Sequence, residues 1–300
     1  MSHGGSKRCT PAYGLSLITP IGSLPTLQII RRNRLEYNFS CQKLKFIKIV
    51  LFITESYFHL SYNRGDMMKI VGHRGIGQGQ HGTALENTIE SFKFAKSLGV
   101  DAIELDVLST KDGKMVVCHD ANLTRLSGKD INIPEINYSE LAEVHLLNKE
   151  TVPLLYDVLG LLQGMPVIID LKTDKYIPTF VKILKKYPDM DITIATYHRK
   201  TIKECKKLAP HIPVFVQRAH TPFGFLQSIR RHGADGLNVR FDLLDPFTYY
   251  HLYKKGLQVQ IYTVDNIYVA KLLKKLYPGI WIVTNHPDKL LPIFADKPKK

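Results

Sequence analysis

Paired acidic side chains interrupt an apolar run of the chain, and their spacing suits metal chemistry. Residues 103–107 read Ile-Glu-Leu-Asp-Val. Side chains two positions apart on a strand point to the same side, so Glu104 and Asp106 share a face. Facing carboxylates inside a protein are costly unless a cation lies between them, and hard divalent cations prefer oxygen ligands. We therefore expect a site for Ca²⁺ or Mg²⁺ here.

A second segment repeats this alternation. Residues 167–172 read Val-Ile-Ile-Asp-Leu-Lys, which places Asp170 and Lys172 on one face of a strand. Either segment alone is compatible with a structural ion pair. Two such segments, together with histidines at neighbouring strand ends, favour a functional site.

Two histidines each end a β-rich run and precede a charged residue. His73 is followed by Arg74, and His119 is followed by Asp120. Imidazole titrates near neutral pH, so one histidine can accept a proton while the other donates one. Arg74 is a permanent planar cation that suits a phosphate oxygen. Together these residue types indicate cleavage of a phosphoester, and the assignment of acid and base stays open.

Alternating strand-like and helix-like segments are expected to position these side chains. Eight strand-then-helix units follow Lys69 in about 230 residues, which is typical of a (β/α)8 barrel (TIM barrel), an α/β fold. Active sites of such barrels lie at the carboxyl ends of the strands. The expected units are 69–74 with 85–99, 102–109 with 156–163, 167–172 with 176–187, 192–197 with 201–208, 214–218 with 224–232, 236–240 with 246–255, 258–264 with 267–276, and 281–285 with 287–295.

One unit departs from this alternation of one strand and one helix. After the strand 102–109, Asp112-Gly113 precedes a further β-rich run, 115–119. Asp-Gly between two such runs is a strong hairpin signal, so the second run is expected to return antiparallel. Residues 121–153 are then expected to form a small excursion above the mouth of the barrel.

Five short motifs follow one another after Lys69. In order they are His73-Arg74-Gly75, Glu86-Asn87-Thr88, Ile103-Glu-Leu-Asp-Val107, Thr110-Lys-Asp-Gly113 and His119-Asp120. In order and spacing these motifs resemble the glycerophosphodiester phosphodiesterase family, and the resemblance extends from about Lys69 to Asp288. It implies a barrel that uses a divalent cation to hydrolyse glycerophosphodiesters to an alcohol and glycerol 3-phosphate.

The resemblance also implies roles for individual residues. His73 and His119 correspond to the catalytic acid–base pair, and Arg74 and Lys172 to phosphate contacts. The implied metal ligands are Glu104, Asp106 and Asp170, and the residues that brace the metal and His73 from the next helix are Glu86 and Asn87.

Three positions depart from the family pattern. Asp170 stands where the family usually has Glu, so the third ligand has a shorter side chain. Tyr262-Thr263 replaces Trp-Thr, which keeps an aromatic wall, and Thr284-Asn285 replaces Thr-Asp.

The motifs are also compatible with other enzyme functions. The same barrel carries lysophospholipase D, sphingomyelinase D and phospholipase C-like enzymes. A remote alternative is an NAD-binding oxidoreductase, because Gly77, Gly79 and Gly82 match a dinucleotide fingerprint. We expect these glycines to form a flexible lid instead.

The charge of the chain bears on which kinds of binding partner are expected. Of 41 basic and 27 acidic residues, residues 1–66 hold nine and three, so residues 67–300 carry an excess of eight positive charges. No nucleic-acid-binding motif accompanies this charge, so no nucleic-acid partner is expected. The resemblance implies a small-molecule glycerophosphodiester or lysophospholipid as substrate. Peripheral membrane contact and the oligomeric state stay open.

The first 66 residues differ from the remainder of the chain. They lack a sustained helical or strand period, and we expect them to be a non-catalytic extension or a misassigned start before a catalytic domain of residues 67–300. No run is apolar enough to predict a transmembrane segment. Four cysteines without CxxC spacing suit a reducing compartment, so a cytoplasmic location is expected.

Overall fold

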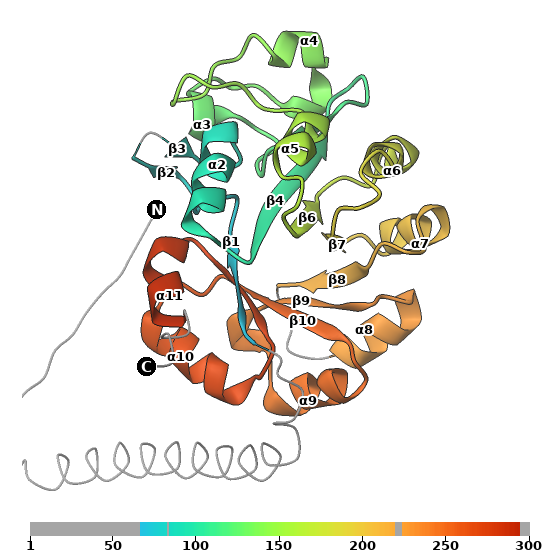
Figure 1. Ribbon diagram of the computed structural model, residues 1–300. Helices are drawn as coiled ribbons and strands as arrows, with labels where there is room; N and C mark the ends of the chain where they lie inside the picture. The colour runs from blue at the N-terminus through green and yellow to red at the C-terminus, as the bar shows by residue number, and fades with distance from the viewer. Residues whose placement is uncertain (1–66, 83, 220–223, 295–300) are drawn as a thin grey trace, which may run out of the picture. The chain divides into compact units, whose positions relative to one another are not determined.

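Eight parallel strands close into a barrel, which confirms the predicted (β/α)8 architecture. The computed structural model describes residues 67–294 except residues 83 and 220–223, so the expectation for residues 1–66 lies outside the described residues. The sheet runs β1-β11-β10-β9-β8-β7-β6-β4, and β1 also pairs with β4, which closes it (Figure 1). The strands are β1 Lys69–Gly72, β4 Ala102–Ser109, β6 Val167–Leu171, β7 Ile192–Thr196, β8 Val214–Arg218, β9 Gly236–Arg240, β10 Gln258–Tyr262 and β11 Trp281–Thr284.

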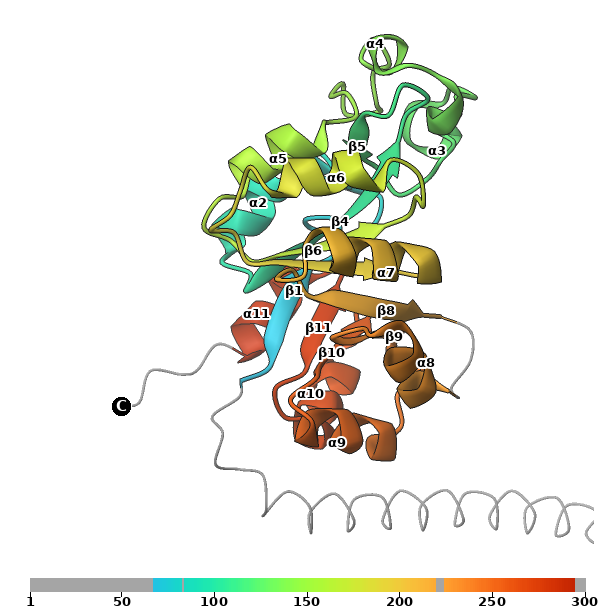
Figure 2. The same cartoon turned by 90° about the vertical axis from the view of Figure 1, so that its right-hand side faces the viewer.

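A helix follows each barrel strand and covers its outer face (Figure 2). Because the strands are covered on both sides, β6 is buried along its whole length. The main apolar core lies between strands and helices, and a smaller cluster that includes Val71, Phe215 and Trp281 is separate from it. The helices are α2 Ile89–Leu98, α5 Leu155–Leu161, α6 Ile177–Leu184, α7 Arg199–Leu208, α8 Phe225–His232, α9 Pro246–Lys254, α10 Ile267–Leu276 and α11 Pro287–Phe294.

The predicted hairpin after β4 is present. Strand β5 (Met115–Val117) pairs antiparallel with β4, and Gly113 adopts a positive φ of 79° in the turn. The excursion that follows contains α3 (Thr124–Ser127), a 3₁₀ turn (Ile133–Glu135) and α4 (Tyr138–Leu141). Its apolar side chains pack with Leu85, Leu108 and Val116 of the neighbouring strands in a cluster separate from the main core, so the excursion is packed onto the hairpin.

The first predicted helix, expected at 85–99, begins later than expected. Residues 80–81 (β2) and 84–85 (β3) form a two-stranded hairpin, and α2 begins only at Ile89, after the cap Thr88. Asn87 has a positive φ of 58°, and its N–H donates to Arg74 O at 3.0 Å, which holds the chain out of a helix. Glu86 and Asn87 therefore lie before the helix and not on it, a correction to the predicted bracing from a helix.

Gly75 allows the chain to turn sharply after β1, and its replacement is expected to be costly. Its φ is 93°, and an added Cβ would lie 2.9 Å from the backbone carbon of Ser91. Gly75→Ala is expected to lower the free energy of unfolding by about 2–4 kcal/mol, from left-handed strain plus overpacking. Urea unfolding followed by circular dichroism measures this. Gly128→Ala is the control, because Gly128 has a φ of 73° but open space around it; equal losses in both variants would contradict the steric account.

Within residues 67–294 apart from the gaps, no helix is long and apolar enough to cross a lipid bilayer.

Candidate active site

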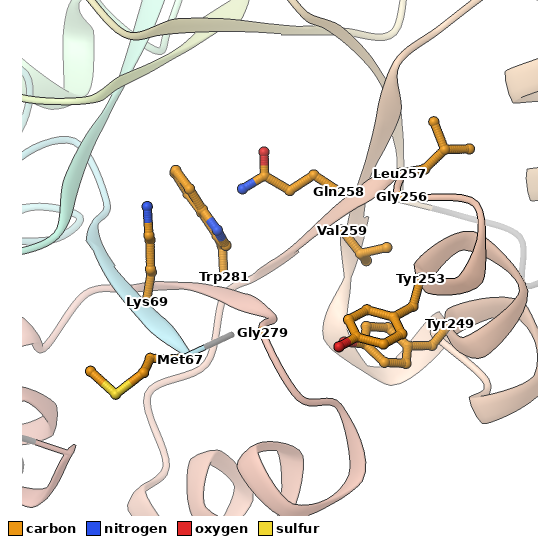
Figure 3. A pocket seen from close by; sticks show the side chains of 10 residues that line it. All are labelled: Met67, Lys69, Tyr249, Tyr253, Gly256, Leu257, Gln258, Val259, Gly279 and Trp281. Carbon is orange, nitrogen blue, oxygen red and sulfur yellow. The ribbon is translucent and has the colours of Figure 1, made fainter. Parts of the chain in front are cut away.

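Two cavities lie at opposite ends of the barrel strands. The larger, about 530 Å³, lies where β1, β10 and β11 begin (Figure 3). There the Lys69 ammonium lies 4.3 Å from the Trp281 ring centroid. No acidic residue or histidine is among the described residues that line it, so it offers neither carboxylate ligands for a metal nor a histidine for proton transfer.

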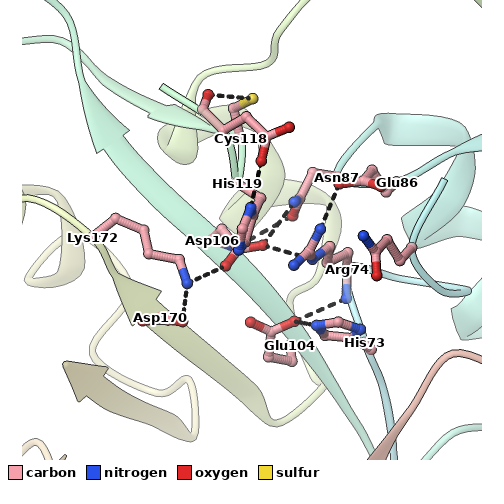
Figure 4. A network of polar contacts seen from close by, with 12 residues as sticks. His73, Arg74, Glu86, Asn87, Glu104, Asp106, Cys118, His119, Asp170 and Lys172 are labelled. Carbon is pink, nitrogen blue, oxygen red and sulfur yellow. Dashed lines mark hydrogen bonds and ion pairs between the residues drawn. The ribbon is translucent and has the colours of Figure 1, made fainter. Parts of the chain in front are cut away.

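The smaller cavity, about 200 Å³, lies at the carboxyl ends of the strands and collects the predicted residues (Figure 4). His73 and Arg74 follow β1, and Asp106 on β4 pairs in register with Asp170 on β6. The alternation along each strand turns these side chains to the same interior. The lining residues are His73, Arg74, Gln78, Glu104, Asp106, His119, Asp170, Lys172, Tyr197, Gln217, Asn238, Tyr262, Thr263 and Val283.

Three buried carboxylates form the centre of the site. Glu104, Asp106 and Asp170 each offer an oxygen, and these oxygens lie within 4.8 Å of one another. Burial, followed by the charges of Asp106 and Asp170, raises the pKa of Glu104 well above its usual value. Asp170 Oδ1 is buried without a hydrogen-bond partner. An all-oxygen donor set with an unpaired buried oxygen fits a hard divalent cation.

Two cations border the carboxylates. Lys172 Nζ lies 3.1 Å from Asp106 Oδ1 and also contacts Asp170, and Arg74 Nε lies 3.2 Å from Asp106 Oδ2. Burial would raise the pKa of Asp106, but Lys172 and Arg74 outweigh it and hold that pKa below its usual value. Both cations face the cavity, where a phosphate could contact them.

Glu86 and Asn87 lie behind these groups. Glu86 Oε1 accepts a hydrogen bond from Arg74 Nη1 at 2.7 Å, and Asn87 Nδ2 donates to Asp106 Oδ2 at 2.9 Å. The two residues brace Arg74 and Asp106. His73 has other partners.

His73 is held by Asn285. The ring nitrogen Nδ1 lies 2.6 Å from Asn285 Oδ1, and the amide of Asn285 is fixed because its Nδ2 donates to Asp265 at 2.8 Å. The amide oxygen only accepts, so Nδ1 carries the proton and Nε2 is left 3.9 Å from Glu104 Oε2. Burial, and next the charge of Arg74, lowers the pKa of His73 to about 4. The neutral ring can accept a proton.

His119 follows the added strand β5 and lies beside Asp106, whereas His73 lies beside Glu104 (Figure 4). Its Nδ1 lies 2.6 Å from Asp120 Oδ1. The side chain is 35% exposed, so it is accessible from the solvent side.

Several residues of the site were missed from the sequence. Gln217 at the end of β8 donates to Asp170 Oδ2 at 2.8 Å. Gln217 lies at an inward-facing position of the strand β8, so the alternation argument that found Asp170 could also have found Gln217. Tyr197 comes from the end of β7, and its hydroxyl lies 2.8 Å from that of Tyr262. This pair forms one wall of the cavity, so the expected aromatic wall has two members.

The glycine-rich segment borders the cavity through Gln78, whose N–H donates to Asn285 Oδ1 at 2.7 Å. In a dinucleotide fold a helix begins at the glycines and presents its N-terminus to the phosphates. Here the β2–β3 hairpin follows Gly79, and α2 begins at Ile89. The segment therefore lacks the helix N-terminus that the dinucleotide reading requires.

Comparisons with known proteins agree with this arrangement. Residues 73–289 match the profile of the Glycerophosphoryl diester phosphodiesterase family. A glycerophosphodiester phosphodiesterase of Caldanaerobacter subterraneus subsp. tengcongensis is 30% identical over 161 residues, which cover 48% of this chain and 64% of that protein. A lysophospholipase D of Homo sapiens is 31% identical over 166 residues, which cover 49% of this chain and 51% of that protein.

Solved structures show the same fold. A phosphodiesterase of Oleispira antarctica, solved in complex with the product sn-glycerol-3-phosphate, has a TM-score of 0.68 at 22% identity; the match covers 75% of this chain and 96% of that chain. The chain spans between half and two thirds of the length of the two curated relatives above.

Proposed function

Because the chain belongs to the glycerophosphoryl diester phosphodiesterase family, we propose that it hydrolyses glycerophosphodiesters to an alcohol and glycerol 3-phosphate. The observation that carries this proposal is the juxtaposition of three carboxylates, two cations and two histidines in one cavity. Metal ligands, phosphate contacts and an acid–base pair are the parts that cleavage of a phosphodiester requires.

Glu104, Asp106 and Asp170 would hold Ca²⁺ or Mg²⁺. When bound, such a cation supplies positive charge that stabilises the negative charge on the phosphate. The shorter side chain of Asp170 keeps its place in the cluster because β6 aligns it in register with Asp106.

The side chains around the carboxylates carry the remaining steps. Arg74 and Lys172 bind the phosphate oxygens and orient the diester. One of His73 and His119 removes a proton from a glycerol hydroxyl or from water, and the other gives a proton to the departing alkoxide. His73 beside Glu104 and His119 beside Asp106 occupy separate places in the cavity, which suits one ring for the attacking group and the other for the departing group (Figure 4).

Glycerophosphocholine is the substrate that tests this proposal. The full chain with Mg²⁺ or Ca²⁺ is expected to release choline and glycerol 3-phosphate, each measured by an enzyme-coupled assay. Lys172→Met is expected to lower kcat/KM by about 10- to 1,000-fold, because a charge-assisted phosphate contact is lost. Lys200→Met, on the exposed surface of α7, is the control. Full activity of Lys172→Met would contradict its phosphate role.

Lysophospholipase D activity is the second candidate, because relatives with that name are as similar to the chain as the glycerophosphodiester phosphodiesterases are. The cavity lining favours the first candidate, since Val283 is its sole aliphatic residue among those described. Comparing kcat/KM for glycerophosphocholine and for palmitoyl lysophosphatidylcholine decides between them.

We also propose that residues 67–300 carry out catalysis and that the chain acts in the cytoplasm, where thiols are usually reduced. The buried free thiols Cys118 and Cys205 are compatible with that setting.

A further inference from the structure

Arg125 links the excursion to the catalytic cavity without lining it. It lies on α3, and its side chain is 39% exposed. Nη1 and Nη2 donate to the two carboxylate oxygens of Glu86 at 2.8 and 2.7 Å, and Nε donates to Asp120 Oδ2 at 2.7 Å. One planar guanidinium thus joins two carboxylates, a geometry that a lysine ammonium cannot reproduce.

The Glu86 end of this link is anchored to the barrel. The Glu86 carboxylate is fully buried, and it also accepts hydrogen bonds from Arg74 Nη1 and from the N–H of Gly79. Burial would raise the pKa of Glu86, but the Arg125 hydrogen bonds and the charge of Arg74 outweigh it and hold that pKa below its usual value. Glu86 is therefore a fixed anionic support for Arg125.

The Asp120 end of the link reaches the catalytic histidine. Asp120 Oδ2 accepts from Arg125, while Oδ1 lies 2.6 Å from His119 Nδ1. A carboxylate accepts only, so Nδ1 carries the proton, and Nε2 is the nitrogen left for chemistry. Since Asp120 is 27% exposed, the Arg125 contact limits the orientations that its carboxylate can take.

We propose that Arg125 is a positioning residue that fixes the tautomer and orientation of His119, using Glu86 as its support and Asp120 as its connector. The excursion after β5 thereby has a catalytic purpose, because it delivers this guanidinium. The inference rests on the proposed function for its kinetic consequences, but the state of the His119 ring is measurable without turnover.

Kinetics give the first test, on the full chain with glycerophosphocholine. Arg125→Ala is expected to lower kcat by about 10- to 100-fold, with KM changed by less than about threefold, because the phosphate contacts remain. Arg125→Lys is expected to recover only part of this loss, and added methylguanidine is expected to restore part of the kcat of Arg125→Ala. Lys129→Ala, an exposed cation of the same excursion, is the control.

A double variant separates positioning from general damage. If Arg125 acts through His119, adding Arg125→Ala to His119→Ala causes no further loss in kcat. Wild-type kcat in Arg125→Ala, or a loss that adds in full to that of His119→Ala, would overturn the proposal.

Nuclear magnetic resonance gives a test that needs no activity. The long-range ¹H–¹⁵N spectrum of the full chain is expected to show His119, assigned with His119→Ala, as the Nδ1–H tautomer, and Arg125→Ala is expected to show a mixture of tautomers. An unchanged His119 ring in Arg125→Ala would overturn the proposal. A wild-type chain without turnover on any glycerophosphodiester would instead count against the proposed function, and the ring measurement would still decide the role of Arg125.

Discussion

Replacing His119 with alanine is expected to lower kcat for glycerophosphocholine by about 10²–10⁴-fold, and His73→Ala is expected to have an effect of the same size. His73 lies beside Glu104 and His119 beside Asp106, so the two rings reach different parts of the cavity and neither is placed to substitute for the other (Figure 4). The rates of purified variants, with circular dichroism to verify folding, test this expectation.

His145→Ala provides the matched control. His145 lies in the excursion, and its Nδ1 contacts only the carbonyl oxygen of Lys149, at 3.2 Å, among the described residues. Its loss should leave kcat within about twofold of the wild type, as is usual for surface residues. Near-full activity in either His73→Ala or His119→Ala would show that the proposed acid–base pair is wrong.

Glu104→Gln is expected to abolish binding of Mg²⁺ or Ca²⁺ and with it nearly all turnover. The variant removes one of three clustered carboxylates but keeps the size of the side chain. In the metal-free protein the substitution is also expected to raise the melting temperature. The pKa of Glu104 in the folded protein is raised above its ordinary value, which applies in the unfolded chain. At any pH above that ordinary value, ionised Glu104 therefore lowers the free energy of unfolding. Glutamine removes this cost.

Two measurements together test the expected loss of metal binding and the expected gain in melting temperature. Isothermal titration of metal into the stripped protein gives the affinity, and thermal unfolding with and without metal gives the stabilisation by binding. Glu204→Gln, on the exposed face of α7, is the control. Wild-type metal affinity in Glu104→Gln would remove Glu104 from the proposed ligand set.

The strand periodicity predicted that Glu104, Asp106 and Asp170 face the interior at the carboxyl ends of the strands, and the structure brings their oxygens together. Glu104 and Asp106 share a face because they are two residues apart on β4, and Asp170 meets them because β6 pairs with β4 in register. Both facts follow from alternation along strands and from the rule that barrel sites lie at strand ends.

Long-range contacts limited the remaining predictions. The start of α2 was placed too early because the turn at Asn87 depends on a hydrogen bond to Arg74, a residue from another element. Arg125 was missed because no periodicity marks it, and its two carboxylate partners come from different segments. Asn285 was noted only as a departure from the Thr-Asp of the family pattern, whereas its amide oxygen holds the His73 ring.

The most direct test of the central claim follows glycerophosphocholine by ³¹P nuclear magnetic resonance with the full chain, first stripped of metal and then supplied with Mg²⁺ or Ca²⁺. The account predicts no change before metal is added, and afterwards replacement of the diester signal by that of glycerol 3-phosphate. Phosphocholine as the product, release that is equally fast without metal, or no release with either metal would contradict it.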